Sequence, residues 1–357
     1  MKTKVLSLCV ASVLAAGCGV SSTTSSSAAC STTQLESALN ADLARTASEV
    51  DFSFAVERQD GRRFSYQRGA STLQTSYESA STSKLVSAVI ILRLVEQGYL
   101  SLSDRPQDRI SAWPIASNDS LYSMTLTQLL SFTSGLTESP LCVDIGISDF
   151  ETCIASIATL NAGSGRTPGQ QFYYANQHLQ VAGLMAIKGR GVATWQDLFA
   201  EFKTQTGLFA NGTYDLPSAT NPRLAGGMHW TGEEYLAFLK ALKNGTLLNT
   251  TSMGQLLTDH TASATIGYSP TTSPITGLGE DWHYGFGLWH ECQSTSYNCA
   301  AGTRVSSPGA YGAYPYWDRD KGYIGIVARQ GARGTYTNGI AIERSVRATV
   351  EQWAACL

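Results

Sequence analysis

The stretch Ser81-Thr82-Ser83-Lys84 places a hydroxyl and an amine three residues apart, where the sequence turns helical. The apolar run from Leu85 to Val95 predicts a buried helix that ends at Gly98. Side chains at i and i+3 share a helix face, so the Lys84 amine is expected beside the Ser81 oxygen. A serine at a helix N-terminus also lies in the field of the backbone N–H groups, which favours an anionic oxygen. The stretch predicts a nucleophilic serine.

A serine three residues before a lysine arises by chance in a Ser-rich chain, so the motif needs context. No other lysine of this chain has a serine at that spacing. The context is the segment from Thr167 to Asn176, in which Pro-Gly marks a turn and Tyr174-Ala175-Asn176 offers a phenol and an amide. Taken alone, this segment favours a packed aromatic loop over a catalytic element.

Together, Ser81, Lys84 and Tyr174-Ala175-Asn176 resemble the S-x-x-K and Y-x-N elements of serine beta-lactamases and penicillin-binding proteins. Further segments look like the branch that holds class C beta-lactamases, D-alanyl-D-alanine peptidases and related esterases. The segment 129–136 is similar to that branch's L-L-x-H-T-S-G-L, with Phe132 where histidine is usual. Segments 97–104 and 225–231 resemble its helix exit and its A-G-G segment, in the same order along the chain. The resemblance covers residues 35 to 355.

The resemblance implies an α/β, beta-lactamase/transpeptidase-like fold, with an antiparallel sheet flanked by terminal helices and a helical insertion. The local patterns agree, because strand signals occur near both ends of the chain and helical signals lie between them. We expect a sheet region at about 33–75 and 275–357 and a helical region at about 80–270. The individual expectations are helices at 33–47, 85–98, 235–243 and 340–355, and strands at 51–57, 62–68, 284–289, 313–318 and 323–329.

The third motif of the family departs from its pattern here. Beta-lactamases carry K-T-G, and many related esterases and peptidases carry H-x-G, where this chain has Ser307-Pro308-Gly309. The resemblance implies that Ser307, Gly309 and Tyr311 contribute to substrate binding, and that the N–H groups of Ser81 and Ala310 form the oxyanion hole. The glycine is kept but the cation is lost. Arg304 is the nearest cation that would substitute, with a solvated surface arginine as the alternative.

The mechanism implied is acyl transfer through a covalent serine ester. Ser81 is the nucleophile, Lys84 the general base, and Tyr174 a general acid or base that shares the proton with it. Asn176 positions the substrate or the Lys84 amine. The choice of base between Lys84 and Tyr174 stays open at the level of sequence.

Three functions remain open. The loss of the third-motif cation favours esters of small or medium acyl groups. The alternatives are a D-alanyl-D-alanine peptidase or weak beta-lactamase, and a catalytically silent binding protein of the envelope. Aromatic residues expected near the mouth of the site suit an apolar group, although each also suits core packing: Tyr173, Trp282, Tyr284, Tyr311 and Tyr314.

Composition fits a compact enzyme with a large core. The chain has 357 residues, of which 43% are hydrophobic and 15% charged, with a net charge of -3. No basic stripe indicates a nucleic-acid partner, and no histidine spacing indicates a metal, so we expect neither. We expect no cofactor, a small-molecule ester or amide as substrate, and a monomer.

The N-terminus has the pattern of a secretory signal peptide, with Lys2 and Lys4 before an apolar stretch. Leu14-Ala15-Ala16-Gly17-Cys18 resembles a lipobox, which makes Cys18 the expected lipid acceptor and the only expected contact with a membrane. Cleavage by ordinary signal peptidase is the alternative. We expect a signal peptide at 1–17, a Ser/Thr-rich tether at 18–32 and a hydrolase domain at 33–357, in the cell envelope or periplasm.

Six cysteines remain once Cys9 and Cys18 are set aside, and six allow fifteen pairings. Local spacing favours Cys142–Cys153 and Cys292–Cys299, which leaves Cys30–Cys356. In the fold that the resemblance implies, the terminal helices pack side by side, which suits this last pair.

Overall fold

The structure is a computed structural model that describes residues 30–271 and 279–357. Residues Thr32–Leu357 form one compact unit. The expected signal peptide, the lipid acceptor Cys18 and most of the tether lie outside the described residues, so these expectations stay predictions.

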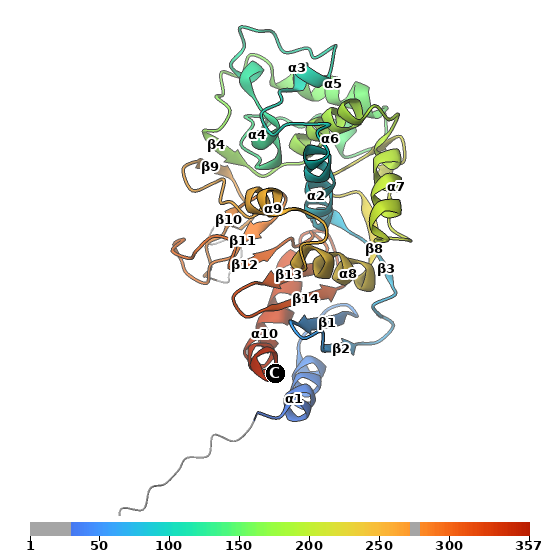
Figure 1. Cartoon of the computed structure of the whole chain (residues 1–357), viewed down its shortest axis with the longest axis vertical. Coiled ribbons are helices and arrows are strands. Elements are labelled where there is room, and N and C mark those ends of the chain that lie inside the picture. Colours follow the sequence, from blue (N-terminus) through green and yellow to red (C-terminus); the bar gives the residue numbers. More distant parts are fainter. Residues whose placement is uncertain (1–29, 272–278) are drawn as a thin grey trace, which may run out of the picture. The chain divides into compact units, whose positions relative to one another are not determined.

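A seven-stranded antiparallel sheet is built from both ends of the chain, in the order β10-β11-β12-β13-β14-β1-β2 (Figure 1). The N-terminal hairpin joins the C-terminal strands through β1 and β14, with Ser53 opposite Ala328. The strands are β1 Ser53–Arg58, β2 Arg63–Gln67, β10 His283–Tyr284, β11 Trp289–His290, β12 Arg304–Ser306, β13 Tyr314–Asp318 and β14 Tyr323–Ala328.

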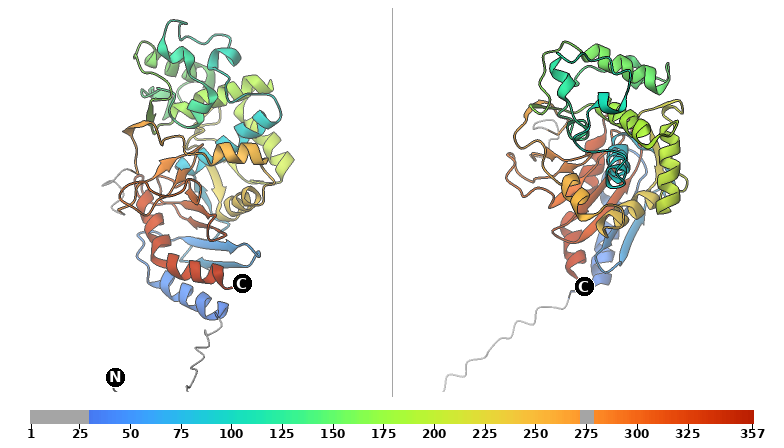
Figure 2. Two further views of the ribbon diagram at one scale, coloured as in Figure 1. Left: turned by 60° about the vertical axis from the view of Figure 1, so that its left-hand side comes forward. Right: turned by 45° about the horizontal axis from the view of Figure 1, so that its top comes forward.

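Helices cover both faces of this sheet. On one face lies α10 (Tyr336–Ala355), with α1 (Thr32–Arg45) beside it (Figure 2). On the other face lies α8 (Gly232–Lys243), whose first residue meets Ala328 of β14. The central strands β1, β13 and β14 are buried along their whole length because both faces are covered.

The middle of the chain supplies the remaining helices, and α2 lies at their centre, in contact with α6, α7 and α9. These helices are α2 Ser83–Glu96, α3 Pro106–Arg109, α4 Leu126–Leu130, α5 Phe150–Asn161, α6 Gln177–Arg190, α7 Trp195–Thr206 and α9 Thr250–Leu256. The apolar run that follows Ser81 is therefore a buried helix, with Ser83 to Leu92 below the surface.

Three small sheets complete this region. They are formed by β3 Ser76–Glu78, β8 Met228–Thr231 and β5 Thr213–Tyr214, by β4 Gln171–Tyr173 with β9 Thr265–Tyr268, and by β6 Pro217–Ser218 with β7 Asn221–Pro222. None of these short pairings was expected from the sequence, because two- to four-residue strands carry too little alternation to be recognised.

The expected fold class is confirmed, with one local correction. The strand expected from Tyr284 to Trp289 is a hairpin of two short strands, β10 and β11. The chain reverses near Gly287, which has a φ of 69°, and a Cβ there would lie 2.5 Å from the Lys84 carbonyl oxygen. Only glycine tolerates both this conformation and this close approach.

The structure contains the two local disulfides, Cys142–Cys153 and Cys292–Cys299. Cys30 and Cys356 are also disulfide-bonded. Their pairing with each other stays a prediction, because Cys30 precedes the compact unit. Within the described residues no helix is both long and apolar enough to cross a membrane.

Candidate active site

Ser81 lies in a 3-10 turn, Ala80–Thr82, that runs directly into α2. Ala80 has a φ of 44°, a conformation that non-glycine residues rarely adopt and that persists only where the surroundings hold it. Ser79 supplies part of that restraint, since its hydroxyl lies 2.7 Å from Thr82 Oγ1 and 2.6 Å from Ser83 Oγ. The turn therefore presents Ser81 in a fixed position.

The Lys84 amine lies beside the Ser81 hydroxyl, as the spacing predicts. Its Nζ is 2.8 Å from Ser81 Oγ and donates to the Ala225 carbonyl oxygen, also at 2.8 Å. The side chain is 1% exposed, and the amine lies 4.6 Å from the centre of the Tyr174 ring. Burial, with a further contribution from the charge of Arg223, holds the pKa of the Lys84 amine well below its usual value.

The Tyr174-Ala175-Asn176 element connects β4 to α6. The Tyr173 N–H donates to the Phe132 carbonyl oxygen at 3.0 Å, and the Tyr174 N–H donates to Tyr268 at 2.9 Å. Burial raises the pKa of the Tyr174 hydroxyl, so this group is protonated at neutral pH. The Asn176 side chain lines the pocket and makes no hydrogen bond to the residues that the structure describes.

Phe132, which stands where the resembled family usually has histidine, packs against the Tyr174 ring. Its ring stacks on His178 at 4.9 Å and lies 5.6 Å from the Tyr174 ring. Burial lowers the pKa of His178 to about 3, so the imidazole is neutral at physiological pH. The phenylalanine substitution thus leaves an apolar support under the Tyr174 ring.

The segment after β12 brings a backbone N–H to the pocket. Ala310 and Ser81 both line it, and the Ala310 N–H donates to no acceptor within the described parts of the chain. A Cβ at Gly309 would lie 2.6 Å from the Ser79 carbonyl oxygen, so the close approach of this segment to the nucleophile's turn requires glycine. This contact supports the register assigned to the third motif.

Ser307 and Gly309 are not among the residues that line the pocket, and their expected contact with substrate stays a prediction. The Ser307 hydroxyl is buried and donates at 3.3 Å to the carbonyl oxygens of Ser81 and Gly287. Pro308 and Tyr311 are the lining residues of this segment.

The interpretation of Arg304 as a substitute cation is wrong. Arg304 is buried on the α10 side of the sheet, where it pairs with Glu291, Asp318 and Glu343 at 2.7–3.1 Å. Side chains alternate between the faces of a strand, and Arg304 and Ser307 are an odd number of residues apart. This parity was the signal in the sequence that separates them.

The pocket in front of Ser81 has a volume of about 360 Å³ and carries two arginines that sequence reasoning missed. Arg223 pairs with Asp144, whereas Arg333 is exposed and has no ion-pair partner among the residues described. The aromatic residues that line the pocket are Tyr174, Tyr268, Trp289, Tyr311 and Tyr336. Trp282, Tyr284 and Tyr314, which were expected near the mouth, belong to the core, and Tyr173 packs on Tyr268 outside the lining.

Arg223 lies two residues before the Ala225-Gly226-Gly227 segment. This proximity to a family motif could have indicated that Arg223 lines the pocket. Arg333 lies between β14 and α10, and no sequence motif near it indicated that it would line the pocket. In the part of the chain that is described, no cluster of three metal-ligating side chains occurs.

Comparisons with known proteins agree with this geometry. The Beta-lactamase family model matches residues 52–339. The putative beta-lactamase from Bacteroides dorei has a TM-score of 0.72 and 21% identity, over 89% of this chain and 98% of that one. EstCE1, a hydrolase with promiscuous acyltransferase activity, has a TM-score of 0.68 and 15% identity, over 88% and 98% of the two chains.

The beta-lactamase/D-alanine carboxypeptidase from Yersinia pestis has a TM-score of 0.67 and 15% identity, over 89% of this chain and 98% of that one. Among curated proteins, Protein flp from Staphylococcus aureus is 26% identical over 113 residues, which are 31% of this chain and 22% of that protein's length. The match therefore spans about a fifth of that relative. The family model covers most of this chain, and its range contains the serine, the lysine, the tyrosine and the third motif: the protein belongs to the Beta-lactamase family.

Proposed function

We propose that this protein is a serine hydrolase that acts through an acyl-Ser81 intermediate on carboxylic esters of small or medium acyl groups. One observation carries the proposal. The Lys84 amine is buried, lies 2.8 Å from Ser81 Oγ, and contacts no carboxylate among the described residues. The lowered pKa of this amine favours its neutral form, which can accept the serine proton.

The reaction follows from the positions of these groups. Ser81 Oγ bonds to the substrate carbonyl carbon while its proton passes to Lys84 Nζ. The oxyanion accepts hydrogen bonds from the N–H groups of Ser81 and Ala310, each worth about 3–4 kcal/mol of barrier. The ester C–O bond then breaks as a proton is delivered to the alcohol, and water hydrolyses the acyl-enzyme by the same route.

The pKa directions favour Lys84 as the base and Tyr174 as the proton donor. Burial lowers the pKa of the amine and raises the pKa of the phenol. We assign to the Tyr174 hydroxyl, whose polar contact with Ser81 partly offsets the effect of burial, the transfer of the proton from Lys84 to the leaving group.

The ester preference rests on the third motif and on the lining. Ser307 provides no cation beside the nucleophile, and the pocket of about 360 Å³ has an aromatic wall that suits an apolar acyl group. A second candidate is a peptidase or weak beta-lactamase acting on carboxylate-bearing amides. It is favoured by Arg223 and Arg333, whose guanidinium groups supply positive charge to the same pocket.

Covalent labelling tests the nucleophile. A fluorophosphonate probe should modify the protein at Ser81 alone, which intact mass and peptide mapping would show. Ser81→Ala should abolish the label and leave the thermal midpoint nearly unchanged. Ser307→Ala, which removes a buried hydroxyl next to the site, is the matched control and should keep the label. Absence of labelling from pH 6 to 9 would instead favour a binding protein.

A further inference from the structure

His178, the second residue of α6, is a fully buried histidine whose two ring nitrogens both have partners. Its Nδ1 lies 2.8 Å from Ser134 Oγ, and its Nε2 lies 2.9 Å from the Tyr173 carbonyl oxygen. The ring is neutral at physiological pH, and a carbonyl oxygen only accepts hydrogen bonds, so Nε2 carries the single proton. Nδ1 then accepts from the Ser134 hydroxyl. The imidazole is therefore held in one tautomer, as a donor to Tyr173.

The acceptor of this bond belongs to the peptide group that joins Tyr173 to Tyr174. The N–H of the same peptide group donates to the Tyr268 carbonyl oxygen at 2.9 Å, and the N–H of Tyr173 donates to the Phe132 carbonyl oxygen at 3.0 Å. A peptide group is planar, so a bond at its oxygen and another at its nitrogen fix the orientation of the whole plane. His178 and β9 thus restrict the directions in which the Tyr174 side chain can point.

Phe132 holds the face of the imidazole. The two rings are stacked, with 4.9 Å between their centroids and 14° between their planes, and the Phe132 ring also lies 5.6 Å from that of Tyr174. Phe132 has a φ of 60°, a conformation that non-glycine residues rarely adopt and that persists only where the surroundings hold it. Position 132 is where the resembled family usually has histidine. This chain carries an imidazole on the facing helix instead, in contact with the phenylalanine.

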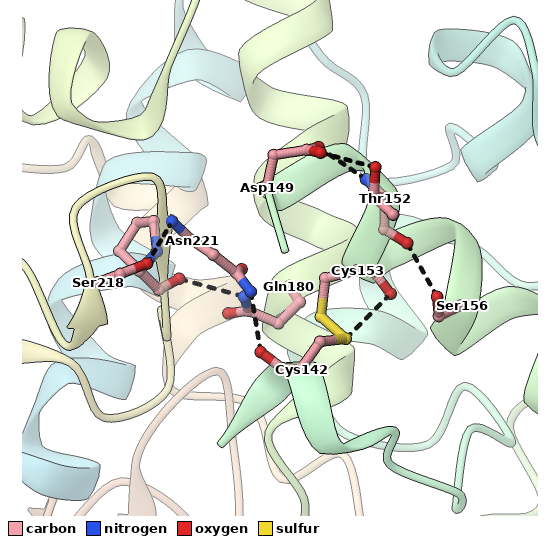
Figure 3. Close-up of a disulfide and its surroundings, with 9 residues drawn as sticks. Cys142, Asp149, Thr152, Cys153, Ser156, Gln180, Ser218 and Asn221 are labelled. Atoms are coloured by element: carbon pink, nitrogen blue, oxygen red, sulfur yellow. Dashed lines mark hydrogen bonds between the residues drawn. A yellow bond between two sulfur atoms is a disulfide. The ribbon is translucent and has the colours of Figure 1, made fainter. Parts of the chain in front are cut away.

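The helix that carries His178 is itself anchored two residues further on. Gln180 is fully buried, and its Nε2 donates to the Pro222 carbonyl oxygen at 3.1 Å. In Figure 3 Gln180 lies beside Asn221, whose Nδ2 donates at 2.8 Å to the carbonyl oxygen of Cys142, one half of a local disulfide. A side chain on an anchored helix can hold a neighbouring peptide group in one place.

The surroundings of the imidazole argue for a role beyond packing. A buried polar side chain adds little net stability, because the loss of its contacts with water offsets most of what its hydrogen bonds supply. An apolar side chain of similar size would also pack on Phe132, but it would offer no donor to the Tyr173 carbonyl oxygen. What His178 supplies is therefore one N–H directed at the backbone of the residue that precedes the proposed proton donor, Tyr174.

We propose that His178, oriented by Ser134, is a positioning residue of the acyl-transfer site, which holds the peptide group before Tyr174 so that the phenol points at the nucleophile. The inference rests on the proposed function and deepens it. Neither His178 nor Ser134 is among the residues that line the pocket in the described structure, so both act through Tyr174 and not on the substrate. The Ser134 hydroxyl sets the tautomer, and the imidazole sets the peptide plane.

The main test is a double-mutant cycle on the hydrolysis of p-nitrophenyl acetate. His178→Leu should lower kcat by about 10–100-fold and change KM by less than about twofold, because a displaced proton donor slows the reaction without changing binding. In a Tyr174→Phe background the same change should lower kcat by less than about twofold, since no donor remains to be positioned. His290→Leu is the matched control, because His290 is also buried with both ring nitrogens in contact with backbone groups. Its effect should be equal in the two backgrounds.

Conservative variants separate the two bonds of the imidazole. A glutamine can place an amide N–H near the position of Nε2, and an asparagine near that of Nδ1. His178→Gln should therefore regain most of the kcat that His178→Leu loses, whereas His178→Asn should not. If His178→Leu does not fold, these two variants replace it in the cycle, with thermal midpoints as the check on folding. Nitrogen NMR of the parent should show the His178 proton on Nε2 alone, a result that does not depend on activity.

An equal loss of kcat in both Tyr174 backgrounds would show that His178 supports the fold in general, and it would overturn the positioning role. A His178→Asn variant as active as His178→Gln, or a proton on Nδ1 in the parent, would overturn it too. If the parent showed neither fluorophosphonate labelling of Ser81 nor ester hydrolysis, the proposed function would fail, and the role of His178 with it. An equal loss in a parent that is labelled would overturn the role of His178 alone, so labelling separates the two failures.

Discussion

Two buried basic side chains, Lys84 and Arg304, have opposite surroundings, and their pKa values shift in opposite directions. Lys84 is 1% exposed and contacts a hydroxyl, a carbonyl and an aromatic face. Arg304 is 7% exposed and contacts Glu291, Asp318 and Glu343. Burial without a counter-charge lowers the pKa of the Lys84 amine, whereas the carboxylates around Arg304 raise the pKa of the guanidinium.

The difference shows how one fold separates chemistry from structure. A lysine titrates within reach of neutral pH when it is buried, whereas an arginine stays charged and binds carboxylates through several N–H groups. The cluster of Arg304, Arg344 and Arg347 joins α10 to the sheet, and the lone amine lies at the nucleophile. Exchanging the two environments would lose both roles.

The largest expected effect is on turnover. Lys84→Met should lower kcat by about 10²–10⁴-fold, because the serine loses its base. Tyr174→Phe should cost a similar factor, and the double variant should be little slower than the slower single variant, because the two groups share one proton path. Steady-state kinetics with p-nitrophenyl acetate would measure all three. Multiplying losses would contradict a shared path.

The comparison becomes sharper when stability is measured. Arg304→Met should destabilise the fold by about 3–5 kcal/mol, because it leaves buried carboxylates without their cation. Lys84→Met should stabilise it at neutral pH, because the unfolded lysine binds a proton that the folded amine gives up.

The sign of the pH dependence follows from the depressed pKa of folded Lys84. Between that pKa and the unfolded value of about 10.4, the unfolded state holds the extra proton, so this group's contribution to stability rises with pH. The gain from Lys84→Met should therefore shrink as the pH approaches 10. Urea unfolding of the parent and of Lys84→Met from pH 6 to 10 provides the measurement. A gain in stability that grows with pH would mean that folded Lys84 is charged.

The smallest expected effect concerns Arg333, an exposed cation that has no ion-pair partner in the described parts of the chain. The parent protein should hydrolyse neutral nitrophenyl esters with little turnover of nitrocefin, which carries a carboxylate. Arg333→Gln should leave ester kcat/KM within about twofold and lower any residual nitrocefin acylation by up to about fivefold, since one exposed ion pair is worth at most about 1 kcal/mol. Rapid nitrocefin hydrolysis by the parent would favour the peptidase or beta-lactamase alternative.

The sequence allowed prediction of what depends on local spacing. Ser81 and Lys84 meet because i and i+3 share a helix face, and the terminal helices and central strands have clear periodicity. Residues brought to the site by tertiary contacts were missed. Arg223 directly follows the β6–β7 hairpin, whose two-residue strands have no recognisable sequence pattern. Arg333 lies in the connection between β14 and α10.

The two wrong predictions, for Arg304 and for the strand from Tyr284 to Trp289, both relied on local sequence and overlooked tertiary geometry. Arg304 is close to Ser307 in the chain, but the alternation of the strand places it on the other face. The run from Tyr284 to Trp289 has the aromatic content of a strand, yet Gly287 must approach the Lys84 carbonyl, and the chain turns there. Proximity in sequence predicted proximity in space for Ser81 with Lys84 and for the two local disulfides, but not across the strand that carries Arg304.

The pairing of β1 with β14 has a consequence for the order of folding. Ser53 finds its partner Ala328 near the opposite end of the chain, so the central sheet cannot close until both ends have been synthesised. Contacts this distant in sequence slow folding, because the chain must close a very long loop before they form. A nascent chain already carries Ser81 and Lys84 while Ala310 is still absent. Ser81 therefore precedes Ala310, its proposed oxyanion donor, during synthesis, and the proposed hydrolytic activity should appear only when folding of the sheet is complete.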